Sequence, residues 1–103
     1  MKTRPVFDPV VHPANRLHIC ALLATTDEGE FGPLREELGV SDSVLSKQLR
    51  ILEEAGYVSL RKASADGKGR VRTWVTLTKS GRRALAGHLA ALHRMTRGAL
   101  PVT

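Results

Sequence analysis

The sequence predicts a mainly helical α+β fold, and three observations lead to that prediction. Two helical segments are joined through Gly39-Val40-Ser41, which has the length and turn chemistry of a helix-turn-helix. Two alternating stretches rich in β-branched residues, 57–64 and 71–77, flank a glycine-containing turn and predict a hairpin. One further helical segment precedes this unit and another follows it. The order is that of a winged helix-turn-helix, with a β-wing of two or three strands and terminal helices that form a dimer.

The N-terminal segment should be an extended arm over residues 1–12, because it shows little periodicity. Pro13 then suits the first turn of a helix over 14–26, where the amide that proline lacks would have no partner. Three residues of this helix form one face, which we expect to pack inward: Leu17, Ala21 and Ala24. The other apolar side chains need a second cover, which we expect to be another subunit: Ile19, Leu22 and Leu23.

The two central helices are delimited by turn residues. A short strand is predicted at 30–32, and Pro33 can start a helix over 33–38. Ser41 is a favourable N-cap for the helix of residues 42–55, and a glycine ends each of the two helices. These two helices form the predicted helix-turn-helix.

The final helix is predicted over 79–95, capped by Thr78. Its apolar stripe contains Leu85, Leu89 and Leu92. We therefore divide the chain into an arm at 1–12, a winged helix-turn-helix domain with its C-terminal helix at 13–97, and a tail at 98–103.

The helix of residues 42–55 has one apolar face and one polar face. The inward residues are Leu45, Leu49 and Leu52, bordered by Gln48. The outward residues are Ser43, Val44, Ser46, Lys47 and Arg50. Such a helix can enter the major groove N-terminus first, so that its amide end and Ser41 meet a phosphate while Lys47 or Arg50 pair with guanine. The alternative is a solvated amphipathic helix, and its neighbours in the chain favour DNA binding.

Charge is distributed unevenly along the 103 residues, whose net charge is +6 and whose pI is about 10.3. Residues 27–54 carry eight acidic and three basic side chains, whereas the ten Lys and Arg residues after them face only Asp66. A basic half of this kind favours nucleic acid or an anionic membrane as partner. The longest apolar run, residues 19–24, is too short to span a membrane, and no secretion signal opens the chain, so we expect a cytoplasmic protein.

The predicted hairpin carries five cations on both sides of its turn, the first of which is Arg61. We expect the other four to contact DNA phosphates or the adjacent minor groove: Lys62, Lys68, Arg70 and Arg72. A solvated turn is the alternative, but a turn alone would not need this excess of positive charge.

Two stretches, VSDSVLSKQLRILEEAGYVSLRK and GRVRTWVTLTKSGRRAL, resemble the winged-helix regulators of the multiple-antibiotic-resistance (MarR) and arsenical-repressor (ArsR) superfamily. The resemblance covers roughly residues 12–95, and it is closest to a compact branch of that superfamily. It implies that 42–55 is the recognition helix and 63–71 the wing. It also implies a homodimer built from the terminal helices, acting mostly as a repressor.

Metal-sensing members of this superfamily place cysteines on the recognition helix or carboxylate and histidine ligands on the last helix. Here the recognition helix has neither Cys nor His, and two of the four histidines are five residues apart on the last helix, on different sides of it: His88 and His93. Metal binding across a dimer, through these residues or His12 and His18, is an alternative to scattered surface histidines. Cys20 is either a redox switch or, as its apolar helix favours, a small buried hydrophobe. No catalytic motif, metal site or cofactor site is predicted, so we expect a non-enzyme.

The predicted dimer interface combines the leftover side chains of both terminal helices: Ile19, Leu22, Leu23, Leu85, Leu89, Leu92 and Met95. Alternatively, the arm folds back and covers them in a monomer, through Val6, Phe7, Val10 and Val11. A homodimer would set two recognition helices one DNA turn apart and require an inverted-repeat operator in double-stranded DNA. The competing functions are a protein-interaction module that binds an acidic partner and a metal- or redox-responsive repressor, and the prediction leaves room for a small-molecule effector.

Overall fold

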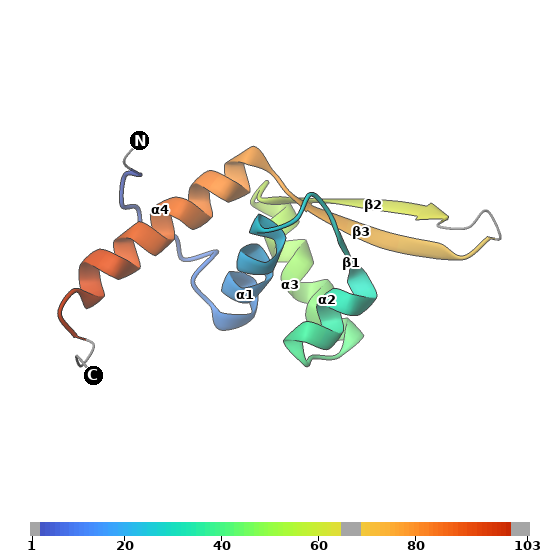
Figure 1. Ribbon diagram of the computed structural model, residues 1–103. Helices are drawn as coiled ribbons and strands as arrows, with labels where there is room; N and C mark the ends of the chain where they lie inside the picture. The colour runs from blue at the N-terminus through green and yellow to red at the C-terminus, as the bar shows by residue number, and fades with distance from the viewer. Residues whose placement is uncertain (1–2, 65–68, 100–103) are drawn as a thin grey trace.

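The computed structural model describes residues 3–64 and 69–99, and within them it contains four helices and one three-stranded antiparallel sheet (Figure 1). In chain order the elements are α1 (Ala14–Ala24), β1 (Gly29–Glu30), α2 (Phe31–Leu38), α3 (Asp42–Glu54), β2 (Val58–Ser64), β3 (Val71–Leu77) and α4 (Lys79–Thr96). The predicted winged helix-turn-helix is confirmed. The short strand lies slightly earlier than predicted, because Phe31 already begins α2.

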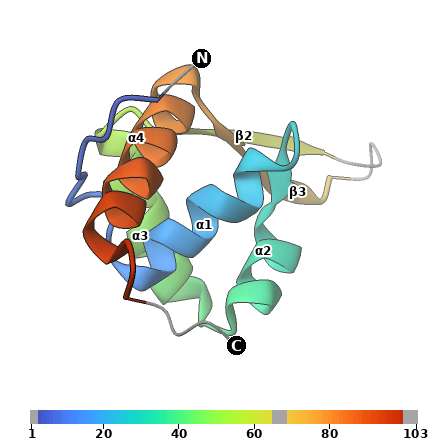
Figure 2. The ribbon, with the colours of Figure 1, turned by 60° about the vertical axis from the view of Figure 1, so that its left-hand side comes forward.

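The molecule is elongated, with principal extents of 53 × 28 × 22 Å. Figure 1 shows the hairpin of β2 and β3 extending from the helical body in one direction and α4 extending in the other. Figure 2 shows α1 between α4 and α2, and α1 also contacts α3 and β3. The wing and the last helix therefore project from a core that surrounds α1. Within the described residues, no helix combines the length and the apolar character needed to cross a membrane.

The helix limits follow from local backbone chemistry. The side chain of Ser41 accepts a hydrogen bond from the amide of Val44 at 3.2 Å, and the side chain of Thr78 accepts one from the amide of Gly81 at 3.0 Å. Both are N-caps, as predicted, and each pairs an amide that the first turn of a helix leaves free. Gly39 has φ of 67°, a left-handed conformation in which a side chain is strained, and it ends α2 directly before the turn.

The sheet has β3 at its centre, paired with β1 on one side and with β2 on the other. Val58 on β2 and both Val75 and Leu77 on β3 are buried. Because side chains alternate across a strand, these residues define one face of the sheet as the core face. The same face continues outward along the wing and is shared by Lys62 and Thr73, which are cross-strand partners.

The predicted inward face of α1 was right in part. Leu17 and Ala24 are half-buried and pack against the core, but Ala21 is exposed, and the fully buried residues are Ile19 and Leu23. The physical reason is the central position of α1, which packs against α2, α3, β3 and α4 and so buries a different and wider arc than a helical wheel suggests. Ile19 and Leu23 are therefore not free to contact a second subunit.

The arm lies against α4 and is not a free extended segment (Figure 2). The amide of Val6 donates to the carbonyl of Gly87 at 2.9 Å, and Val11 is fully buried. A Cβ on Gly87 would come within 3.3 Å of the Arg4 carbonyl oxygen, so a glycine suits this close approach. The arm thus covers part of α4, as the monomer alternative requires, although Phe7 keeps 42% of its surface exposed.

Candidate nucleic-acid interface

Helix α3 presents the two faces that its sequence predicts. Its buried residues are Leu45, Leu49 and Leu52, which confirms the core face. Its exposed residues include all five outward positions: Ser43, Val44, Ser46, Lys47 and Arg50. The outward face thus offers hydroxyl and amine groups in the N-terminal half of the helix and a guanidinium group one turn further on, which are the groups that read base edges and phosphates.

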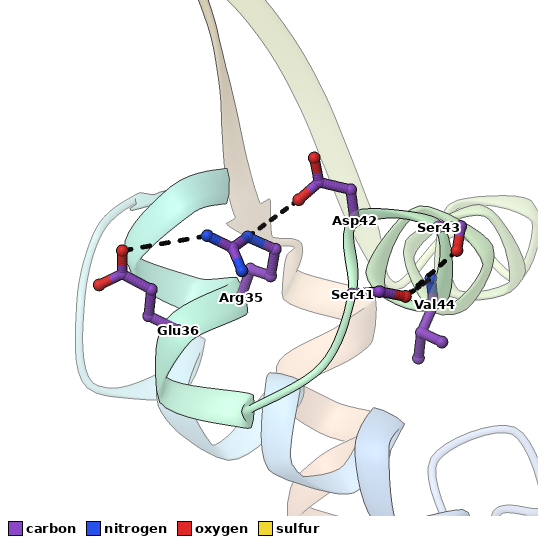
Figure 3. A network of polar contacts seen from close by, with 6 residues as sticks. All are labelled: Arg35, Glu36, Ser41, Asp42, Ser43 and Val44. Carbon is purple, nitrogen blue, oxygen red and sulfur yellow. Dashed lines mark hydrogen bonds and ion pairs between the residues drawn. The ribbon is translucent and has the colours of Figure 1, made fainter.

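The start of α3 is held by two polar contacts that Figure 3 shows together. The Ser41 hydroxyl, which caps the helix, also lies 3.1 Å from the Ser43 hydroxyl. The Nε of Arg35, from α2, lies 2.9 Å from Oδ1 of Asp42 in the first turn of α3. This ion pair joins the two helices across the turn and balances a carboxylate beside the helix N-terminus, where a phosphate would approach. The sequence-based reasoning missed this pair, although an acidic residue directly after an N-cap could have pointed to it.

The wing separates its cations onto two faces. Arg61 pairs with Trp74 in the strand register and Arg72 with Ala63, and these four residues share the face opposite Lys62. On that face, Arg61 lies 2.8 Å from Glu28, and its guanidinium is 5.8 Å from the centre of the Trp74 ring. The hydrogen bond from Arg61 lowers the pKa of the Glu28 carboxyl below its ordinary value.

Arg72 is also engaged within the protein. Its Nη1 lies 3.3 Å from Oε1 of Glu30, on the neighbouring strand β1. The prediction grouped Arg72 with the phosphate contacts, but its ion pair and its face direct it away from the recognition helix. We therefore infer that Arg61 and Arg72 stabilise the wing through their ion pairs with Glu28 and Glu30. Among the described residues, no ion pair involves Lys47, Arg50 or Lys62.

A groove connects the recognition helix to the wing. It has a volume of about 310 Å³ and is lined by Phe31, Ser46, Leu49, Leu60, Lys62 and Thr73. Its apolar floor belongs to the core, and its polar rim combines a hydroxyl of α3 with an amine of β2. Lys62 and the outward face of α3 therefore lie along one continuous surface, which could follow a DNA backbone from a groove to the adjoining phosphates.

The sequence profile of the winged helix DNA-binding domain family matches residues 15–96. The chain belongs to this family. The winged-helix protein is 34% identical over 92 residues to an uncharacterized protein of Methanocaldococcus jannaschii. The aligned region covers 89% of this chain and 94% of that protein. It is 38% identical over 53 residues to a biofilm growth-associated repressor of Xylella fastidiosa, covering 50% of this chain and 43% of the repressor.

Solved structures give the same result. A transcriptional regulator homologue from Pyrococcus horikoshii OT3 has a TM-score of 0.80 at 27% identity, with 87% of each chain covered. A MarR-family transcriptional regulator from Silicibacter pomeroyi has a TM-score of 0.57 at 27% identity, covering 89% of this chain and 62% of that one. The resemblance to MarR-like regulators that the sequence motifs carry is thereby confirmed.

Two other cations were predicted to contact DNA from the wing of this winged-helix protein. Lys68 lies outside the described residues. Arg70 is exposed, directly before β3. Neither assignment is tested by the structure, and both stay predictions.

The sequence had suggested scattered surface histidines, but one of the four is buried. His88 is fully buried, and its Nε2 lies 3.1 Å from Nδ1 of His12, whereas His18 and His93 are exposed. Within the described residues, no group of three or more His, Cys, Asp and Glu side chains is arranged to hold a metal ion. Cys20 is fully buried in the winged-helix core, and burial raises the pKa of its thiol to about 11. It is the small buried hydrophobe that its helix favoured.

Proposed function

We propose that this member of a family of transcriptional regulators is a sequence-specific repressor that binds double-stranded DNA as a homodimer. The observation that carries the proposal is the surface formed by the outward face of α3 and the Lys62 side of the wing. Along this surface, Lys47, Arg50 and Lys62 are exposed and take no part in the ion pairs of the described residues. Three such cations can neutralise phosphates or pair with guanine edges.

The roles within the surface differ. Arg50 and Lys47 are assigned to base edges in the major groove, and Val44 to a thymine methyl group. Lys62, on the rim of the groove beside Ser46, is assigned to the phosphate backbone. Repressor activity is supported by the sequence similarity to a biofilm growth-associated repressor, which covers 50% of this chain.

The homodimer is proposed on the side of α4 that the arm leaves open. Leu89 is 46% exposed and Met95 is 63% exposed, and Leu92 between them is half-buried. Leu85 lies in the protomer core and, like Ile19 and Leu23, is removed from the proposed interface. A two-fold dimer that covers the remaining apolar side chains of both α4 helices would place two recognition helices about 34 Å apart, which is one turn of DNA. Its binding site would be an inverted repeat.

The experiment is selection of bound sequences from a random duplex pool, followed by sedimentation of the free protein. We expect an enriched inverted repeat and a dimer at micromolar concentration. Leu89→Asp should yield a monomer that has lost tight binding to the full site. Val44→Asp, an equally drastic change on the exposed face of α3, should stay dimeric and lose DNA binding. A pool with no enriched sequence, or binding that ignores salt, would instead indicate a protein-interaction module with an acidic partner.

A further inference from the structure

The arm and α4 are joined by a histidine pair that the proposed DNA interface does not use, in which His88 of α4 is fully buried and His12 of the arm is exposed. The amide of Asp8 donates to Nδ1 of His88 at 2.9 Å, and Nε2 of His88 lies 3.1 Å from Nδ1 of His12. The ring of Phe7 packs on both imidazoles, with centroids 4.8 Å from each. The amide of Val6 adds a further hydrogen bond, to the carbonyl of Gly87 one residue before His88.

These contacts indicate which nitrogen carries the proton when each ring is neutral. Because a backbone amide donates to Nδ1 of His88, that nitrogen has no proton, and the proton of the neutral ring is on Nε2. Nε2 of His88 therefore donates to His12, whose own proton must then be on Nε2. A second proton on either ring would have to enter at Nδ1. In both rings that atom already accepts a hydrogen bond.

The surrounding charged groups do not compensate for the hydrogen bond that a second proton at Nδ1 would break. Asp8 is the nearest carboxylate, and its oxygens already accept from the amides of Val10 and Val11 and from the hydroxyl of Tyr57. That hydroxyl stays protonated, because its bond to Asp8 raises the pKa of Tyr57 to about 12.

Helix α1 contributes two more titratable groups on this side of the core. Arg16 donates to the carbonyl of Val10, and the buried Cys20 thiol is neutral. Burial lowers the pKa of His88 below its ordinary value, His12 lowers it further, and Asp8 acts in the opposite direction.

We propose that His12 and His88 form a proton-sensitive clasp, which holds the arm on α4 at neutral pH and releases it in acid. In the open arm the His88 ring is solvated and gains a second proton near pH 6.5. In the closed arm it cannot accept that proton without losing the hydrogen bond from the Asp8 amide. The closed form is therefore fully favoured above about pH 6.5 and is progressively disfavoured as the pH falls below that value.

Amide hydrogen exchange of the intact protein tests the clasp without DNA. The readouts are the Val6 and Asp8 amides, which lose their acceptors when the arm opens, and the Gly39 amide in the α2–α3 turn is the reference. The proton excluded from His88 lowers protection by up to about tenfold at pH 5.5. After correction for intrinsic rates, we expect a loss of up to about tenfold from pH 7.5 to pH 5.5.

A matched pair of variants separates the clasp from general acid sensitivity. His88→Asn keeps an acceptor near the Nδ1 position but cannot gain a proton, so its protection should change by less than about twofold over the same pH range. His93→Asn, at an exposed position of the same helix, should behave like the wild type. Protection of Val6 and Asp8 that is equal at both pH values, or a His88→Asn variant as acid-sensitive as the wild type, would overturn the proposal.

Ring-nitrogen chemical shifts give a second readout that does not depend on folding stability. At pH 7.5 the His88 imidazole should be neutral with the proton on Nε2. A proton on Nδ1 of either His12 or His88 would contradict the hydrogen-bond assignment. Any effect of the clasp on operator affinity would rest on the proposed function, and its absence would leave these exchange and NMR results unaffected.

Discussion

Two adjacent cations of β2 provide a sharp test of how the wing meets DNA. Arg61 and Lys62 are both exposed, but strand alternation sends them to opposite faces. Arg61 pairs with Glu28 at 2.8 Å, whereas Lys62 lines the groove beside Ser46 on α3. Replacing either residue by Ala removes one positive charge at almost the same position in the chain. We predict that only Lys62→Ala removes a phosphate contact.

The magnitude follows from counterion release. Each phosphate contact contributes about 0.9 to the slope of log affinity against log salt concentration. Raising the salt concentration from 50 to 200 mM weakens DNA binding by the wild type. For Lys62→Ala, that fold-decrease in affinity should be about threefold smaller. Arg61→Ala should keep the wild-type slope, because its charge is balanced by a carboxylate and directed away from α3.

Anisotropy titrations of a labelled random duplex at several salt concentrations would measure both slopes. Circular dichroism of each variant would check that the wing variants remain folded. An equal reduction for both variants would mean that the wing acts only through its total charge, and the assignment of faces would then be refuted. An unchanged slope for Lys62→Ala would mean that the hairpin is a solvated turn.

Three further predictions concern the core, base reading and the thiol. Gly81→Ala should lower the free energy of unfolding by about 2–3 kcal/mol in a denaturant titration, because its Cβ would overlap the carbonyl of Tyr57. Gly32→Ala, where nothing lies within 4 Å, should change it by less than about 1 kcal/mol and in the stabilising direction. Arg50→Ala should cost about 1–3 kcal/mol on the selected operator and relax preference at one base pair, whereas an equal loss on every sequence would make it a phosphate contact. Cys20, whose pKa is raised to about 11, should react with a thiol reagent at pH 8 more than about a hundredfold faster in denaturant than in the native protein, and similar rates would refute its burial.

The sequence by itself determined the elements and the exposed polar face of α3, because both depend on neighbours in the chain. Ser41 and Gly39 delimit the helix-turn-helix through hydrogen bonds and backbone conformations that extend only a few residues. The leucines of α3 define a single apolar stripe, so its exposed face could be assigned without knowing what packs on the other side.

The tertiary structure alone decided the direction of side chains whose partners are distant in sequence. Helix α1 is apolar nearly all round, so the inward position of Ile19 depends on the four elements that surround the helix. The pairing of Arg72 with Glu30 requires β1 beside β3, and no local pattern encodes that distance of 42 positions. In the sequence His88 looks like a surface residue, but in the structure the arm covers it, and Asp8 of the arm is 80 positions away. Burial and ion pairing are properties of the whole assembly of elements, and for that reason periodicity and composition could not predict them.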